Sequence, residues 1–415
     1  MACRLDAARS LAHTPSTMGR LVAAVFLFLT ASLPASAAPS LVTFRGGSVL
    51  DRFSETYELD AREIADPDAW RYLSPEVKGA IQSLEAAYGF RATLAYSKVM
   101  RGFYADLSDQ QVRALGHEPI IESITITVLM ASTDDGGAWG VTRVTTGRDA
   151  TTLSNEPSRE SPLVEGVTVY VIDSGIDASN ADLNVVKQVN FVGGPGSDCN
   201  GHGTHVAGTI GARDNAIGVT GVAPGVALVG VKVVDCDGAG SSATLIKGID
   251  WVAANAVKPA LINLSLGGGE SPELGRAVQH AVADGLFFSI AAGNSGKDAC
   301  LTSPSLNGFS SGVITVAAVD ANDTEPGFSN FGGCVDLWAP GVAILSTFIG
   351  PHPLNTLSGT SMAAPHVAGA AALYLANNPK ATPSEIESAL IGASFIPGTA
   401  SKDGRTILRL QVPIQ

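Results

Sequence analysis

Aromatic and charged side chains are both scarce in this 415-residue chain. Phe, Trp and Tyr make up 6% of the residues, charged residues make up 16%, and glycine occurs 46 times. Hydrophobic residues nevertheless reach 45%, which excludes an intrinsically disordered chain. Many glycines suit an α/β protein with tight connections, although composition alone does not decide the fold.

Basic residues are outnumbered, because the formal net charge is −13. Residues 132–415 carry 25 acidic and 14 basic side chains, so most of the excess lies in the later part of the chain. A nucleic-acid partner would require a basic face, and the sequence therefore excludes nucleic acid as a partner. An acidic surface mainly keeps a protein soluble.

Long apolar runs are absent beyond the N-terminus. Arg20 precedes the apolar run Leu21–Leu29, and Ala35-Ser36-Ala37 is a small-residue cleavage site. The run is too short to cross a membrane. We therefore predict a secretion signal over residues 1–38, with Met18 as an alternative start and a buried N-terminal helix as the alternative structure. The mature protein is expected to be secreted, extracellular, monomeric and free of the membrane.

Cysteine is rare, with five residues in the whole chain. Cys3 falls in the predicted signal, which leaves four in an exported protein: Cys199, Cys236, Cys300 and Cys334. An even set in an oxidising compartment predicts disulfides. Four cysteines allow three pairings, and counting does not choose among them.

Residues 39–131 mix helical and extended patterns in a small unit, which predicts an α+β module. Its expected strands and helices are Leu41–Phe44, Glu76–Tyr88, Ala92–Val99 and Ser108–Leu115, followed by an apolar run at Ile120–Leu129. Residues 132–160 are polar and indicate a linker.

From about residue 165, short β-branched runs alternate with amphipathic helices, which predicts a parallel sheet flanked by helices. Functional sites of such sheets lie beyond the carboxyl ends of the strands. The expected strands are Val167–Asp173, Val226–Asp235, Ala260–Leu266, Phe287–Ala292 and Val313–Val319. The expected helices are His202–Ala212, Ser242–Ala256, Glu273–Asp284, Ser361–Ala376 and Pro383–Ile391.

Three short stretches carry candidate catalytic residues. Val169–Gly175 is an apolar strand that ends in Asp173, although aspartate at a strand end is also a common turn residue. Asn200–Gly208 holds His202 and His205 on one helix face, where a metal site is an alternative. Ser358–His366 places Ser361 at a helix start, where serine is also a frequent cap.

Taken together, in the order Asp, His, Ser, these stretches resemble the active-site motifs of the subtilisin-like serine proteases. Ala291–Gly296 is similar to the oxyanion motif of that family, and Asn263–Gly267 to its substrate-binding strand. Four further stretches resemble the proteinase K branch, in particular its aqualysin-type bacterial members: Asp198–His202, Val234–Gly238, Phe328–Gly332 and Cys334–Gly341.

The resemblance implies a serine endopeptidase that works through an acyl-enzyme and needs no cofactor for catalysis. Ser361 would be the nucleophile, His202 the general base and Asp173 its orienting carboxylate, with Asn294 as an oxyanion donor. Polypeptide substrates would bind as an extended strand, with an apolar or aromatic residue before the scissile bond. The implied substrate-binding residues are Gly238, Ala239, Gly240, Ser265, Leu266, Gly267, Ala292 and Gly293.

The same resemblance implies the disulfides Cys199–Cys236 and Cys300–Cys334. It also implies structural calcium with Asp336 as a ligand, although Pro304–Gly312 is longer than in the family pattern. Asp336 as an ordinary solvated acid is the alternative.

The first unit, residues 39–131, resembles a family propeptide that assists folding and then stays bound as a transient inhibitor. Cleavage is expected after Ala131, which leaves residues 132–415 as the peptidase domain. Two rival functions are a catalytically silent binding protein on the same fold and a secreted inhibitor built on the first unit.

Overall fold

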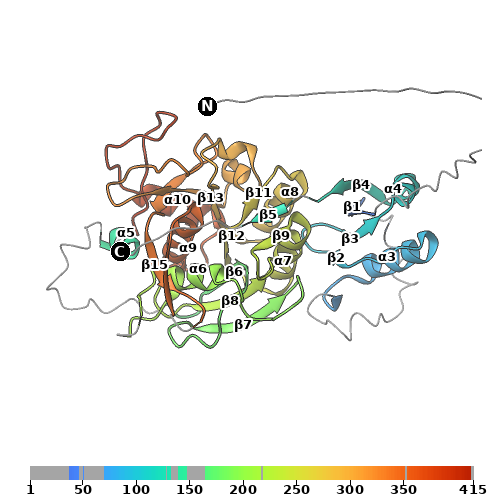
Figure 1. Cartoon of the computed structure of the whole chain (residues 1–415), viewed down its shortest axis with the longest axis horizontal. Coiled ribbons are helices and arrows are strands. Elements are labelled where there is room, and N and C mark those ends of the chain that lie inside the picture. Colours follow the sequence, from blue (N-terminus) through green and yellow to red (C-terminus); the bar gives the residue numbers. More distant parts are fainter. Residues whose placement is uncertain are drawn as a thin grey trace, which may run out of the picture. The chain divides into compact units, whose positions relative to one another are not determined.

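The computed structural model describes residues 37–45, 50, 70–127, 129–131, 139–146, 164–215, 218–350 and 353–412 (Figure 1). Nearly all of the predicted signal segment, and Ser132 at the expected cleavage site, lie outside these residues. Among the described helices, none is both long and apolar enough to pass through a bilayer.

A seven-stranded sheet forms the centre of the later part of the chain, with the order β14-β13-β12-β10-β6-β8-β7. Every neighbouring pair in it is parallel, which confirms the α/β prediction. Its strands are β6 (Thr168–Asp173), β7 (Val185–Asn190), β8 (Ala227–Lys232), β10 (Ala260–Leu264), β12 (Leu286–Ala291), β13 (Val313–Val319) and β14 (Leu337–Pro340).

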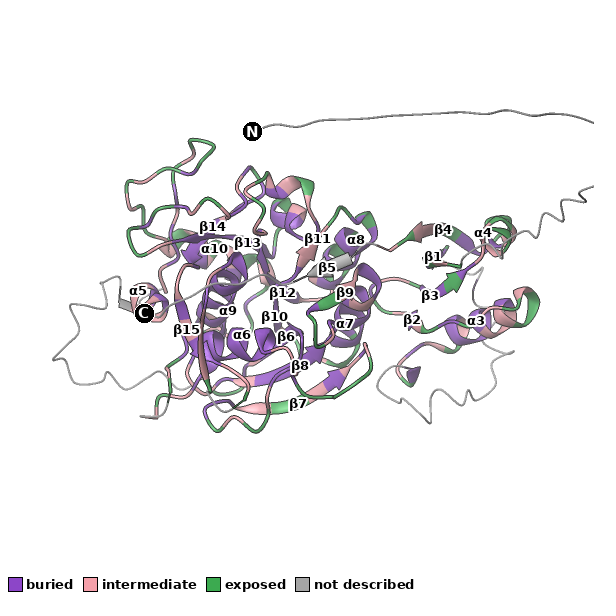
Figure 2. Ribbon diagram, viewed as in Figure 1, coloured by how far each residue is buried: buried purple, intermediate pink, exposed green. Residues whose placement is uncertain are grey.

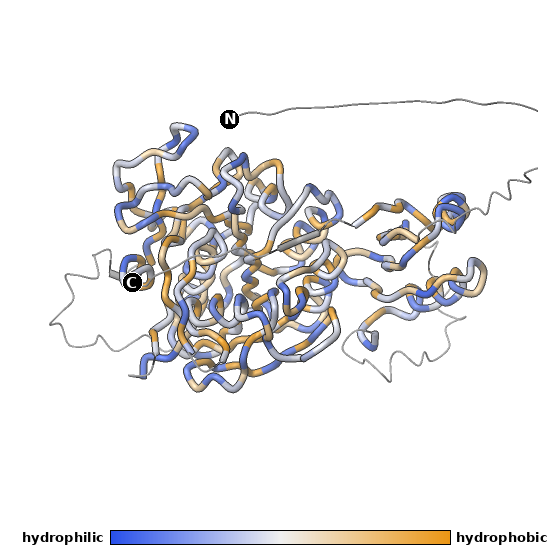
Figure 3. Tube along the Cα trace, viewed as in Figure 1, coloured by the Kyte–Doolittle hydropathy of each residue, from blue (hydrophilic) through white to orange (hydrophobic). Residues whose placement is uncertain are grey.

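Side chains of the central strands alternate between two apolar layers, as the two-residue period of a strand requires. One layer packs α6 (His202–Gly211), α9 (Thr360–Asn377) and α10 (Pro383–Ala393) on Val169, Val171, Leu261, Phe287 and Ile314. The other packs α7 (Ser242–Asn255) and α8 (Pro272–Ala283) on Tyr170, Ile172, Ile262, Phe288 and Ile290. The central strands are therefore buried and hydrophobic along their length (Figures 2 and 3).

Polar caps set the starts of three of these helices. Ser241, Ser271 and Thr382 each accept a backbone N–H from the first turn of α7, α8 and α10. At α7 and α10 the third helical residue also bonds back to the cap, which completes a capping box. The sequence had placed each of these helices within two residues of its observed bounds.

Smaller elements complete this part of the chain. They are α5 (Gly140–Thr146), the short strands β9 (Ala239–Ser241) and β11 (Gly267–Gly268), the hairpin β15 (Ile344–Thr347) and β16 (Leu354–Leu357), and the 3₁₀ turns η3 (Ala299–Leu301) and η4 (Ser305–Phe309). Sequence patterns had not indicated β7, β14 or the hairpin.

The first unit contains a four-stranded antiparallel sheet with the order β2-β3-β1-β4. Its elements are β1 (Ala38–Phe44), α3 (Pro75–Tyr88), β2 (Leu94–Tyr96), β3 (Gly102–Leu107), α4 (Asp109–Leu115) and β4 (Ile121–Ile126). Of these, β3 was not predicted. The strand β5 (Leu129–Ala131) follows and leaves this sheet.

A buried polar cluster joins the first unit to α7. The carboxylate of Asp250 accepts backbone N–H groups of Lys98 and Val99, each at 2.7 Å, and the Tyr72 hydroxyl at 2.6 Å. Lys247 donates to Ala95 O at 2.8 Å. Buried charged groups are costly unless they are hydrogen-bonded. These hydrogen bonds therefore hold the first unit against α7.

Both predicted disulfides are present, Cys199–Cys236 and Cys300–Cys334. They close loops of similar length, with sequence separations of 37 and 34 residues. The first joins the segment before α6 to the segment after β8, and the second joins η3 to the segment before β14.

Removing either disulfide should cost similar stability. We expect Cys199→Ser/Cys236→Ser and Cys300→Ser/Cys334→Ser each to lower the free energy of unfolding by about 3–4 kcal/mol, because each releases a loop of similar length in the unfolded chain. Thermal scans of the inhibited mature enzymes at one scan rate measure this. An unchanged midpoint in either variant would contradict the expectation.

Candidate active site

The three predicted catalytic residues lie at the carboxyl edge of the parallel sheet. Asp173 is the last residue of β6, and His202 is the first residue of α6. Ser361 lies in the first turn of α9, next to Ser265, which directly follows β10. Strands β10 and β8 flank β6 on opposite sides, so the chain changes direction across the sheet at this point. Such a switch point is where ligands bind in open α/β sheets.

Asp173 and His202 form a buried pair. Nδ1 of His202 lies 2.7 Å from Oδ1 of Asp173, and the two residues are 1% and 0% exposed, respectively. The Ser174 N–H also donates to that oxygen, at 2.7 Å. A carboxylate on Nδ1 fixes the tautomer and the ring orientation that leave Nε2 as the basic nitrogen.

Close backbone packing explains the glycines on both sides of His202. Gly201 has φ +104°, and a Cβ there would lie 2.3 Å from the Phe348 ring. A Cβ at Gly203 would lie 2.1 Å from Gly175 O, in the turn that follows Asp173. The missing side chain at Gly203 lets the first turn of α6 pack against the turn that follows Asp173.

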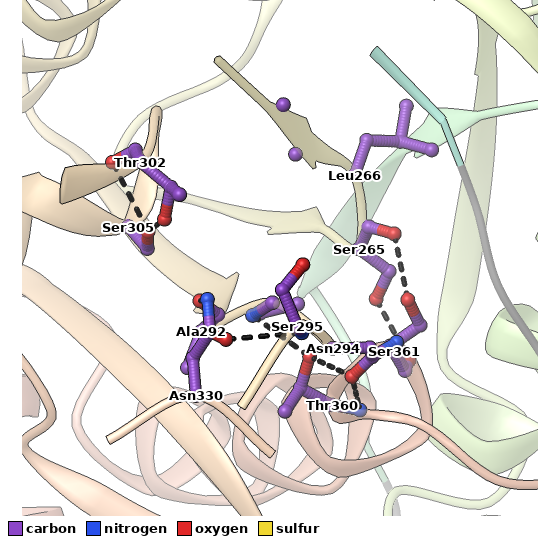
Figure 4. A pocket seen from close by; sticks show the side chains of 14 residues that line it. Ser265, Leu266, Ala292, Asn294, Ser295, Thr302, Ser305, Asn330, Thr360 and Ser361 are labelled. Atoms are coloured by element: carbon purple, nitrogen blue, oxygen red, sulfur yellow. Dashed lines mark hydrogen bonds between the residues drawn. The ribbon is translucent and has the colours of Figure 1, made fainter. Parts of the chain in front are cut away.

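Ser361 is held through its backbone and its hydroxyl. Ser265 Oγ donates to Ser361 O at 2.8 Å, while Ser361 Oγ donates to Ser265 O at 3.0 Å (Figure 4). A nucleophilic Ser361 would turn this hydroxyl from Ser265 O towards His202. Its place in the first turn of α9 puts the positive end of the helix dipole at the site.

Thr360 orients the side chain of Asn294. The N–H and hydroxyl of Thr360 both donate to Asn294 Oδ1 at 2.8 Å, and Gly293 N–H donates to Thr360 Oγ1 at 2.9 Å (Figure 4). With Oδ1 held on this side, Nδ2 of Asn294 faces the other way. Sequence reasoning missed Thr360, although it directly precedes Ser361, the expected nucleophile.

A cavity of about 240 Å³ opens beside Ser361. Its walls are Ser265–Gly268 and Ala291–Ser295, and its remaining lining residues are Thr302, Ser305, Asn330, Thr360 and Ser361 (Figure 4). None of these lining residues carries a charged side chain. The sequence had indicated the two walls but not the hydroxyls of Thr302 and Ser305, which hydrogen-bond to each other at 2.7 Å.

The strand β5 lies between the two expected substrate strands. It is the central strand of a three-stranded antiparallel sheet with the order β11-β5-β9. Ala131 pairs with Gly267 on one side and with Ala239 on the other, and Met130 pairs with Gly268 and Gly240. The backbone of residues 129–131 therefore occupies the position that an extended peptide would take.

The other two histidines near the pair are structural. His205 lies within hydrogen-bonding distance of Ile344 O, and burial lowers its pKa to about 3. His366 contacts Met362 O, and burial lowers its pKa to about 4. Both stay neutral near pH 7. In the part of the chain that the structure describes, no three His, Cys, Asp or Glu side chains gather as metal ligands would.

Asp336, the expected calcium ligand, is half-buried beside β14. Oδ2 of Asp336 accepts Thr315 N–H at 2.7 Å, and burial raises its pKa to about 7. The longer loop packs closely on that oxygen, since a Cβ at Gly308 would lie 3.0 Å from it. Asp336 can therefore supply one carboxylate, in crowded surroundings.

Asp182, before β7, is a second carboxylate that sequence reasoning did not single out. This residue is 3% exposed, and no donor among the described residues reaches its Oδ1. Burial raises its pKa, while the Val219 N–H, the Asn215 side chain and the charge of Arg213 lower it. Calcium needs oxygen ligands, whereas these neighbours are N–H donors and a cation, so they do not mark a calcium site.

Comparisons with known proteins agree with this geometry. A family model described as the subtilase family matches residues 164–409. An extracellular serine proteinase of Thermus sp. (strain Rt41A) is 42% identical over 73% of this chain and 73% of its own length. Alkaline serine exoprotease A of Vibrio alginolyticus is 40% identical over 75% of this chain and 58% of its own length.

One further relative and one solved structure are also similar to this chain. A cuticle-degrading protease of Metarhizium anisopliae is 35% identical over 78% of this chain and 83% of its own length. The crystal structure of a cold adapted subtilisin-like serine proteinase superimposes with a TM-score of 0.60 and 40% identity, covering 68% of this chain and all of that one. With the fold, the site and these similarities in agreement, the chain belongs to the subtilase family and is a serine endopeptidase.

Proposed function

We propose that this chain is a secreted, extracellular endopeptidase whose Ser361 hydroxyl attacks the carbonyl carbon of a peptide bond. His202 Nε2 takes the hydroxyl proton and passes it to the leaving amine, and water then hydrolyses the acyl-enzyme. The observation that carries this proposal is the buried 2.7 Å hydrogen bond between Asp173 and His202. Asp173 orients the imidazole and stabilises its cation during both steps.

The negative oxygen of the tetrahedral intermediate needs donors. We assign this role to Nδ2 of Asn294 and to the backbone N–H of Ser361, in the first turn of α9. Two hydrogen bonds from Thr360 fix the amide of Asn294 beforehand, so no reorientation is needed during reaction. In subtilisin, loss of the corresponding donor lowers kcat about 10²–10³-fold, and we expect a similar loss here.

Residues 39–131 act as a propeptide in this proposal, and cleavage falls between Ala131 and Ser132. The pairing of β5 with β9 and β11 supports this cleavage site, because β5 ends at Ala131 between the two strands that are expected to bind substrate. Contacts of Asp250 with the first unit would hold the cleaved segment in place as an inhibitor. A large parallel sheet has many non-local contacts and folds slowly, so a folding template is useful.

Replacing the nucleophile should stop maturation. We expect Ser361→Ala to accumulate as an uncut precursor without its signal, while the wild-type chain yields a mature form starting near Ser132. N-terminal sequencing of the secreted proteins decides this. The exposed Ser384→Ala is the matched control and should mature normally. A Ser361→Ala protein that matures without other proteases would refute self-processing through this serine.

The cavity beside Ser361 sets the preference for the residue before the scissile bond. Its uncharged lining favours apolar and aromatic side chains, and binding through backbone edges keeps selectivity elsewhere broad. Thr302 and Ser305 add hydroxyl groups to this lining, but no charge.

A charge placed in this cavity should redirect specificity. We expect Thr302→Asp to raise kcat/KM for substrates with Lys or Arg before the scissile bond by about tenfold or more relative to Phe, because a carboxylate would then face the cationic side chain. Thr302→Asn is the uncharged control of the same shape. Cleavage of a peptide library measures both, and equal profiles for the two variants would place this cavity outside the specificity site.

Structural calcium is also part of the proposal, with Asp336 as a ligand. A chelator should lower the thermal midpoint of the mature enzyme, because calcium binds only the folded state. We expect Asp336→Ala to remove much of this effect. A wild-type midpoint that ignores the chelator would refute calcium binding.

A further inference from the structure

A second pair of charged residues is buried beside the catalytic pair, and the mechanism above does not use it. Lys232 is 0% exposed and Asp198 is 8% exposed. Lys232 ends β8 and is directly paired with Asp173 of β6 in the sheet register. Asp198 lies four residues before His202, next to the disulfide-bonded Cys199.

Lys232 contacts the turn that follows the catalytic aspartate. Its Nζ donates to Ser174 O at 2.7 Å and to Cys199 Sγ at 3.3 Å. Neither partner is charged, so the ammonium relies on nearby carboxylates for compensation. Burial lowers the pKa of Lys232, whereas Asp198, Asp235 and Asp173 raise it, in that order.

Asp198 holds the start of the helix that carries His202. Its Oδ1 accepts the Ser174 hydroxyl and the Gly201 N–H, each at 2.9 Å. Its Oδ2 accepts the N–H and the hydroxyl of Thr204, at 3.0 and 2.6 Å. Ser174 Oγ in turn accepts Gly203 N–H at 2.9 Å. The network thus links the turn after Asp173 to both sides of His202.

Several charged groups lie around the catalytic pair. Asp173 contacts the imidazole, Asp198 binds the backbone on both sides of His202, and both carboxylates act on Lys232. Asp235, after β8, adds a further acidic group on the Lys232 side. His205 and His366, with pKa values of about 3 and 4, stay neutral near pH 7.

We propose that Lys232 is a positioning residue for the triad: it anchors the turn after Asp173 and cancels the charge of Asp198, so that His202 responds to Asp173 alone. Loss of Lys232 would leave an uncompensated carboxylate that stabilises the imidazolium. His202 would then be protonated, and inactive as a base, up to a higher pH. Loss of the Asp198 charge would have the opposite effect.

The test measures kcat/KM against pH for mature enzymes, with an uncharged peptide substrate and active-site titration by a serine-reactive phosphonate. In Lys232→Met we expect the acid limb of the profile to move up by roughly half to one pH unit. In Asp198→Asn we expect it to move down, and the double variant should return close to the wild-type limb. A purely structural role would instead lower activity in both variants without opposite shifts.

Matched controls complete the design. Lys187→Met removes a positive charge from the exposed neighbouring strand β7 and should leave the acid limb of the pH profile unchanged. Lys232→Arg keeps the positive charge and should also leave this limb unchanged. If Lys232→Met does not mature, the Asp198→Asn enzyme decides alone. An acid limb at lower pH supports the proposal, and an acid limb at the wild-type pH overturns it. The inference rests on the triad proposed above. An active Ser361→Ala enzyme would refute the triad, whereas unshifted limbs in active variants would refute only the role of Lys232.

Discussion

The hydrogen bond between Asp173 and His202 is the interaction on which the rest of the site depends. It requires a strand that ends in a carboxylate at the switch point of the sheet and a helix that begins with histidine at the same edge. It also requires two glycines that let the segments approach closely. Burial strengthens this bond and also strengthens the influence of nearby charges, which is the basis of the role proposed for Lys232 and Asp198.

In the proposed function, substrate is recognised through backbone pairing rather than through side-chain contacts. Strands β9 and β11 leave a gap that one extended chain fills on both edges, and β5 fills it in this structure. The same arrangement explains how one segment could serve as the first substrate and then as an inhibitor. The apolar and polar contacts of α7 with the first unit add affinity that a short peptide lacks.

Local patterns were enough to predict β6, β12 and β13, because these buried strands are mainly apolar runs, whereas the short buried strand β14 was missed. The edge strand β7 has a half-exposed, mixed pattern and was missed. The disulfide pairing came from family resemblance and not from cysteine counting. Thr360 and Lys232 contact residues distant in sequence, Asn294 and Ser174, so only the fold brings these partners together.

We propose that Asp173, His202 and Ser361 form one nucleophilic unit. Mass-spectrometric mapping of a serine-reactive phosphonate on the mature enzyme tests it most directly. We predict a single adduct, on Ser361, that forms at least 10²-fold more slowly in a His202→Ala enzyme whose propeptide is supplied and removed separately. An adduct on another serine, or labelling of Ser361 at an undiminished rate without His202, would contradict the account.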